Sequence, residues 1–103
     1  MSTKIIILDR KFAVSPKYRV ILSVQKIEGT KKYKHQIKSR FILIDVENDS
    51  IRLLIDNHEP LGFHIHTELP QNKSLRIPLL TEDYNEALNI FFDEVERIIQ
   101  NEK

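Results

Sequence analysis

The C-terminal part of the chain carries an apolar stripe with the period of an α-helix, and this stripe constrains the fold most. Thr81 is a suitable N-cap for the helix, and Glu82 and Asp83 suit the positive end of its dipole. A helix with one apolar face has to bury that face against another element. Members of the stripe recur at intervals of three and four residues: Tyr84, Ala87, Leu88, Phe91, Phe92, Val95, Ile98 and Ile99.

The segments before this helix alternate apolar and polar residues, which is the pattern of half-buried β-strands. Residues 41–44 are apolar on both faces, which predicts a central strand or a bulge midway through a long one. The sequence therefore predicts a single α+β domain over residues 1–103, an antiparallel meander sheet of five or six strands with the C-terminal amphipathic helix packed on one face. The strands are expected at 5–8, 18–24, 31–46, 51–55, 63–67 and 75–77, with a connection at 9–17.

Composition excludes several classes of protein. The chain has no cysteine, which rules out disulfides, thiolate metal sites and cysteine nucleophiles. It has no apolar run long enough to span a membrane and no signal peptide, so we expect a cytoplasmic protein with no membrane partner.

Charge divides the chain unevenly. Residues 1–80 contain 14 Lys and Arg against 8 Asp and Glu, whereas residues 81–103 contain 2 against 7. This split indicates either an anionic partner for the basic part or an acidic helix covering one side of a basic sheet.

The basic residues concentrate in the segment 26–40, with Tyr33 and His35 among them. Cations around an aromatic ring are typical of single-stranded RNA binding, although a solvated hairpin whose lysines discourage edge pairing has the same pattern. We expect His35 to be a surface strand residue. The cations are Lys26, Lys31, Lys32, Lys34, Lys38 and Arg40.

Three of the four histidines, His58, His64 and His66, fall within nine residues, directly after Asp56 and Asn57. Opposed residues of an antiparallel hairpin point to the same face of the sheet. Burying the apolar set of 51–55 with that of 63–67 pairs Asp56 with either His64 or Gly62. Both registers place Arg52, Asp56, His64 and His66 on the face opposite the core, with His58 in the loop.

This cluster allows three interpretations. In metal-free acid–base chemistry, two histidines move protons at a phosphodiester while Asp56 fixes a histidine tautomer. The catalytic candidates are then His58, His64, His66 and Asp56, and the substrate-binding candidates are Arg40, Arg52, Lys38, Lys34, Tyr33 and Asn57. In a metal site, His58, His64 and His66 would be the ligands. In the third interpretation the histidines are half-exposed strand residues without a chemical role.

The chain also resembles the TumE family of prokaryotic toxin–antitoxin systems. The matching residues are Asp56, Asn57 and His58, then His64 and His66, with Phe92-Asp93-Glu94-Val95 near the end. The resemblance implies a toxin-like role and a helix-turn-helix antitoxin as partner.

The leading hypothesis is therefore a toxin that cleaves RNA by metal-independent histidine acid–base chemistry, without a cofactor. One alternative is a non-catalytic module that binds nucleic acid or protein through a basic sheet face. A second alternative is a His-ligated metal-binding protein, and a homodimer stays open in each case.

Overall fold

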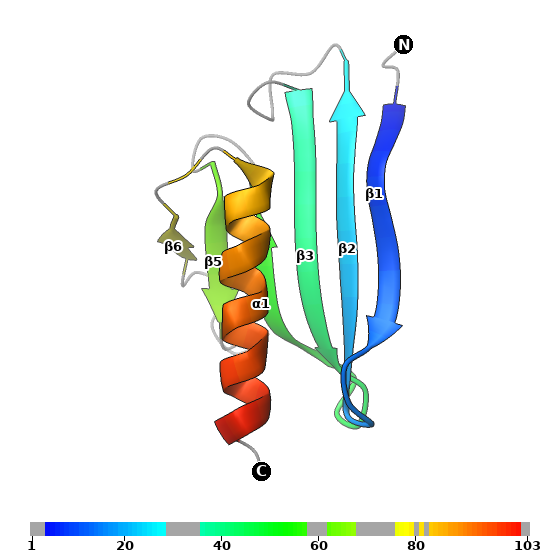
Figure 1. The fold of residues 1–103 in the computed structure, drawn as a ribbon, viewed down its shortest axis with the longest axis vertical. Helices are drawn as coiled ribbons and strands as arrows, with labels where there is room; N and C mark the ends of the chain where they lie inside the picture. The colour runs from blue at the N-terminus through cyan, green and yellow to red at the C-terminus, as the bar shows by residue number, and fades with distance from the viewer. Residues whose placement is uncertain are drawn as a thin grey trace.

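Each strand of the predicted meander pairs with the next strand along the chain. The computed structural model describes residues 4–28, 36–57, 62–67, 76–79, 81 and 83–101. In them, six strands form one antiparallel sheet in the order β1-β2-β3-β4-β5-β6, and one helix follows (Figure 1). The α+β architecture expected from the sequence is confirmed. The elements are β1 (Lys4–Ala13), β2 (Tyr18–Ile27), β3 (Ile37–Asp45), β4 (Ser50–Asp56), β5 (His64–Thr67), β6 (Arg76–Pro78) and α1 (Tyr84–Asn101).

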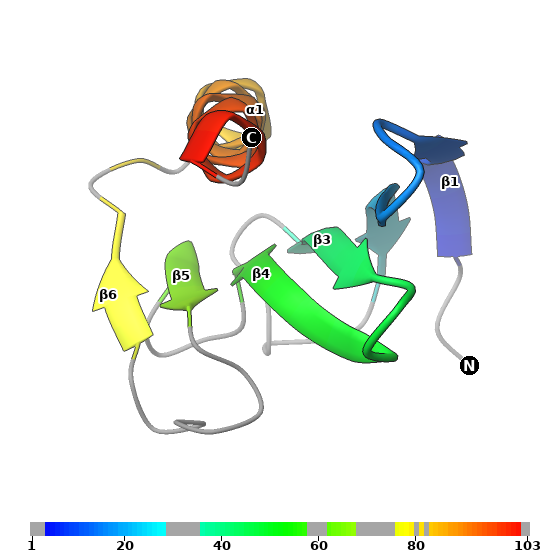
Figure 2. The ribbon, with the colours of Figure 1, turned by 90° about the horizontal axis from the view of Figure 1, so that it is seen from below.

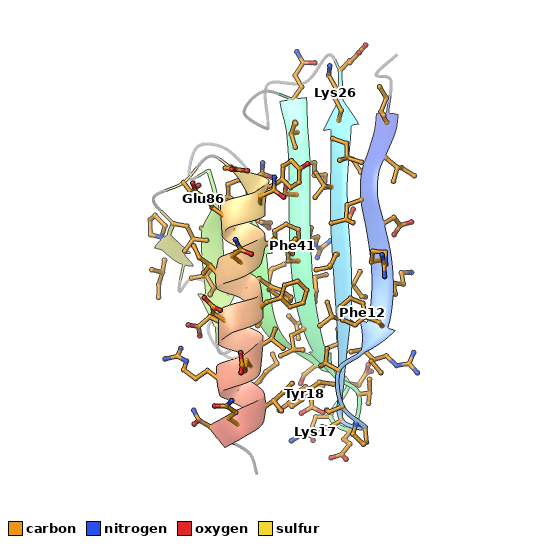
Figure 3. The ribbon with its side chains drawn as sticks, in the orientation of Figure 1. Phe12, Lys17, Tyr18, Lys26, Phe41 and Glu86 are labelled. Carbon is orange, nitrogen blue, oxygen red and sulfur yellow. The ribbon has the colours of Figure 1, made fainter. Side chains whose placement is uncertain are left out.

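The core lies between α1 and the sheet. The helix contacts β3 and β4 and buries Ala87, Phe91 and Val95 from its stripe against them. Phe91 packs on Phe41 of β3 with ring centroids 5.9 Å apart (Figure 3). Alternation along the strands supplies the facing apolar residues, namely Val20, Leu22, Val24, Phe41, Leu43, Leu53, Ile55 and Ile65.

The sheet is curved around the helix. Seen from below, its edge strand β1 rises toward the side on which α1 lies (Figure 2). This curvature brings Phe12 of β1 onto Phe92 of α1, with ring centroids 6.4 Å apart. The sheet therefore has a helix-covered face and an opposite face, called here the helix-distal face.

The first strand is longer than the sequence predicts. Residues 9–13 were expected in a connection, but β1 continues to Ala13, which pairs with Arg19. The backbone groups of the polar residues at this edge form hydrogen bonds with β2. The strand therefore continues although its apolar run has ended. The connection is confined to 14–17, where Ser15 Oγ accepts hydrogen bonds from the backbone nitrogens of Lys17 and Tyr18.

The helix begins at a different cap from the one expected. Asp83, and not Thr81, occupies the N-cap position, because its Oδ1 accepts from Asn85 N at 2.9 Å. Its backbone oxygen accepts the first helical bond, from Ala87 N at 3.1 Å. Thr81 Oγ1 accepts from Asp83 N at 3.1 Å and thus supports the cap from outside the helix.

The apolar character of 41–44 has two structural counterparts. β3 is an interior strand, and its register with β4 shifts between Leu43 and Ile44. Ile42 and Leu54 are buried on the helix-distal face, each 8% exposed. Among the described residues, no helix is both long and apolar enough to cross a membrane.

Candidate functional site

A row of polar residues crosses five strands on the helix-distal face. Successive partners in the ladders are Asp9 of β1, Ser23 of β2, Arg40 of β3, Asp56 of β4 and His64 of β5. Directly opposed residues have Cβ atoms about 5 Å apart, so the side chains of the row lie side by side on this face. Of the two registers that the sequence allows, the structure has the one that pairs Asp56 with His64.

His64 is held at both ring nitrogens. Nδ1 lies 2.7 Å from the backbone oxygen of Gly62, and Nε2 lies 2.6 Å from Oδ1 of Asp56. A carbonyl oxygen only accepts, so Nδ1 carries a proton in this arrangement. Nε2 then faces the carboxyl group of Asp56.

The turn before β5 sets the position of the Gly62 carbonyl that contacts the His64 ring. Gly62 has φ +65°, in the left-handed region, and a Cβ added there would meet no atom within 4 Å. Glycine is therefore favoured by the backbone conformation and not by crowding. Sequence reasoning considered Gly62 only as a pairing partner of Asp56 and missed its carbonyl, which fixes the His64 ring.

His66 lies in the adjacent row, beside apolar residues on its β4 side and paired with Arg76 on its β6 side. Its partner on β4 is Leu54, and the partner of Leu54 on β3 is Ile42. The His64 and His66 rings meet edge to face, with centroids 4.7 Å apart. The two residues are 3% and 7% exposed, so the interpretation of half-exposed strand histidines is wrong about their burial.

Three side chains of the cluster converge on a small volume. Asp56, His64 and His66 each offer one donor atom, and these atoms all lie within 4.8 Å of one another. His58, the third histidine of the predicted metal set and a predicted catalytic residue, lies outside the described residues. A carboxylate and two imidazoles are suitable ligands for a divalent transition metal and also suitable groups for proton transfer.

Asn57 faces the strand next to it. Its Oδ1 accepts from Ser39 N at 2.9 Å, and its Nδ2 donates to Ile37 O at 2.6 Å. The residue is 5% exposed. Both ends of the amide therefore form a hydrogen bond with the β3 backbone.

The predicted phosphate-binding cations are arranged unequally around the cluster. Arg40 is exposed and lies directly across from Asp56, and Lys38 is half-buried two residues earlier on the same face. Arg52 is half-buried at the register shift, where no residue of β3 directly opposes it. Of the predicted cations that the structure describes, Arg40 directly opposes a residue of the cluster, whereas Tyr33 and Lys34 lie outside the described residues.

The two layers of the molecule differ in charge. Helix α1 carries four carboxylates, Glu86, Asp93, Glu94 and Glu96, against the single cation Arg97. Among the directly paired residues whose side chains the structure describes, strand alternation places four cations on the helix-distal face, together with Asp9 and Asp56. These cations are Lys11, Arg19, Lys38 and Arg40.

Comparison with protein-family models, with curated proteins and with solved structures finds no match to this chain. The resemblance to the TumE family stays a prediction from the residues quoted above. Function is therefore inferred from the chemistry of the site.

Proposed function

We propose that the protein is the toxin of a toxin–antitoxin pair and that it cleaves RNA by metal-independent acid–base chemistry. The observation that carries this proposal is the His64–Asp56 pair, which lies beside His66 and across from the exposed Arg40. Two imidazoles next to a carboxylate and a guanidinium supply proton transfer and phosphate binding in one place.

In the proposed reaction one histidine accepts the proton of a ribose 2′-hydroxyl, whose oxygen attacks the adjacent phosphorus. The bond from phosphorus to the 5′-oxygen breaks, and the second histidine donates a proton to that oxygen. The products are a 2′,3′-cyclic phosphate and a free 5′-hydroxyl. We assign the donor role to His64, whose ring is in contact with Gly62 and Asp56 at its two nitrogens, and the acceptor role to His66.

The accessible rim of the cluster supports an approach of phosphate from the β3 side. The Asp56 side chain is 27% exposed, whereas that of His64 is 4% exposed. Arg40 is exposed directly across from Asp56. A phosphate bound by Arg40 would therefore stand next to the only part of the described cluster that solvent reaches readily, with His58 as a third acid–base candidate.

Single histidine substitutions test the proposal. We expect His64→Gln and His66→Gln each to abolish growth arrest on expression and to lower cleavage of an RNA oligonucleotide by the purified protein about 100-fold or more. His35→Gln is the matched control and should stay active. Circular dichroism and thermal unfolding identify variants that remain folded. Folded His64 and His66 variants that arrest growth as strongly as the unchanged protein would contradict the catalytic assignment.

A non-catalytic binding module is the second candidate, and the burial of both histidines favours it. In this case the basic segment docks RNA or a protein, and the histidines hold the sheet together. Reversing the charges of Lys31, Lys32 and Lys34 should then abolish growth arrest, while folded His64 and His66 variants keep it.

The antitoxin implied by the family resemblance gives a further test. A helix-turn-helix protein encoded next to this chain should bind it and relieve growth arrest on co-expression. We propose the acidic side of α1 as the surface for a basic antitoxin segment. Replacing Asp93 and Glu96, both exposed, with lysine should weaken that complex.

A further inference from the structure

We propose that Asp56, His64 and His66 form a binding site for one divalent transition-metal ion, with Zn²⁺ as the ion best suited to these ligands. The proposed ligand set replaces His58 of the sequence-based set with Asp56. It draws one carboxylate from the end of β4 and two imidazoles from β5, so that two neighbouring strands hold all three donors.

The first support is the short contact between Asp56 and His64. Oδ1 and Nε2 are 2.6 Å apart, yet within the described part of the chain Oδ1 is buried and receives no hydrogen bond of ordinary geometry. The contact is therefore not an N–H···O bond of ordinary geometry. A cation bound by both atoms would stabilise them side by side.

The second support is the position of His66. A shared proton needs only two acceptor atoms, but here a third donor lies within 4.8 Å of the other two. Metal-bound nitrogen and oxygen atoms at about 2.1 Å from Zn²⁺ lie about 3–3.5 Å apart, so small side-chain rotations bring the three onto one ion. Two histidines and one carboxylate leave a coordination position open for water or a substrate oxygen.

The third support is the hydrogen bond that His64 makes with its other ring nitrogen. A metal-ligating histidine ordinarily donates its other ring nitrogen to a carboxylate or a backbone carbonyl, which fixes the tautomer and the ring orientation. His64 Nδ1 makes this contact with the Gly62 oxygen at 2.7 Å. The His64 side chain is 4% exposed and that of Asp56 is 27% exposed, so the site is buried on the imidazole side and accessible at the carboxylate.

A bound ion would also regulate the proposed reaction, and this part of the inference rests on the proposed function. The ion would use Nε2 of His64, the atom assigned to proton donation. Micromolar Zn²⁺ is therefore expected to inhibit RNA cleavage, and a chelator is expected to restore it.

Metal binding is tested on the protein alone, without RNA. We expect one equivalent of Zn²⁺ by isothermal titration calorimetry, and one equivalent of Co²⁺ by visible absorption, on tag-free protein freed of metal. Asp56→Asn and His66→Gln should each weaken binding more than about 100-fold. This exceeds the loss of about 10–100-fold expected when only a hydrogen-bond partner of a metal ligand is removed. Asp56→Asn is nearly isosteric and should leave the fold intact. Asp93→Asn, which removes an exposed carboxylate from α1, is the matched control and should bind as tightly as the unchanged protein.

Three results would overturn the site. The first is no binding of either ion, and the second is binding that survives both Asp56→Asn and His66→Gln in folded protein. The third is binding that His58→Ala removes and Asp56→Asn leaves unchanged, which would favour the ligand set predicted from sequence. Cleavage that is absent while one equivalent of metal binds would contradict the proposed function and leave the site standing.

Discussion

Asn57 prolongs the pairing of β3 with β4 by means of its side chain. The last backbone pair of this ladder is Arg40 with Asp56. Beyond it, the Asn57 amide takes the place of a peptide group, since it accepts from Ser39 N and donates to Ile37 O. The contact fixes the end of β4 directly after Asp56 and therefore contributes to the position of the site.

Substitution of Asn57 should be costly. Asn57→Ala leaves Ser39 N and Ile37 O without these partners, and we expect the free energy of unfolding to fall by about 1–3 kcal/mol. Urea denaturation followed by circular dichroism measures the change. A loss within experimental error would show that the two hydrogen bonds of the Asn57 side chain make no net contribution to the free energy of unfolding.

Ser39 provides a matched comparison on the same strand. The residue is fully buried, and its Oγ has no hydrogen-bond partner within the described part of the chain. Ser39→Ala removes a desolvated hydroxyl and keeps the backbone bond to Asn57. Its stability should therefore equal or exceed that of the unchanged protein by up to about 1 kcal/mol, in contrast to Asn57→Ala.

The individual site residues were only partly predictable. The alternation of residues between the two faces of a strand required Asp56, His64 and His66 to share a face. Any other register would expose the apolar residues of β4 and β5. Their burial was not predictable, since it depends on what surrounds a face of the sheet and not on local alternation. Asn57 and Gly62 act through contacts that no sequence pattern encodes, namely an amide to a neighbouring strand and a carbonyl to a ring.

At the scale of elements, Asp45 organises the β3–β4 hairpin. Its Oδ1 accepts from the backbone nitrogens of Glu47 at 3.0 Å and Asn48 at 3.1 Å, and its Oδ2 accepts from Asn48 Nδ2 at 2.7 Å. Lys17 Nζ lies 3.7 Å away. Asp49 completes the turn at φ 50°, a left-handed conformation that Asp adopts more readily than most residues.

These contacts make the hairpin sensitive to acid. The side-chain hydrogen bond from Asn48, then the backbone bonds and Lys17, hold the pKa of Asp45 below its ordinary value of 3.8, although burial opposes them. Because the pKa of Asp45 is lower in the folded state than in the unfolded state, the carboxylate stabilises the fold at pH values above its unfolded-state pKa. This stabilisation is lost as the pH falls through the folded-state pKa.

Asp45→Asn tests this linkage. The variant should be less stable than the unchanged protein at about pH 6, and the difference should shrink as pH falls below the ordinary value of 3.8. Urea midpoints across this pH range measure the difference. A stability difference that does not change with pH would mean that the charge of Asp45 has no part in it.

Elements with strong periodicity were predicted well, and their ends were not. The stripe from Tyr84 to Ile99 predicted the helix because three of its residues fill the core. Asp83 and Thr81 are both good N-caps, and only the backbone path decides between them. β1 extends beyond its isoleucines because its backbone forms hydrogen bonds with β2, and the polar sequence of this part does not predict that pairing.

At the scale of the whole molecule, opposite charges lie on the two sides of the sheet. The acidic helix covers one side, while Arg40 and Lys38 lie near the histidine cluster on the other. An anionic polymer is therefore attracted to the helix-distal face and repelled from the helix. The charge split along the sequence left open an anionic partner or an acidic helix over a basic sheet, and it did not place the cations beside Asp56 and His64.

The salt dependence of RNA binding separates a local contact from the overall charge. Each phosphate contact with single-stranded RNA contributes about 0.7 to the slope of log affinity against log salt concentration. Arg40→Gln should lower this slope by about that amount in a fluorescence anisotropy titration of a short RNA. Lys26→Gln removes an equal charge from an exposed residue at the end of β2, on the helix side by strand alternation (Figure 3), and should leave the slope unchanged. Equal losses for the two variants would mean that RNA senses only the net charge, and a face-specific interface would be excluded.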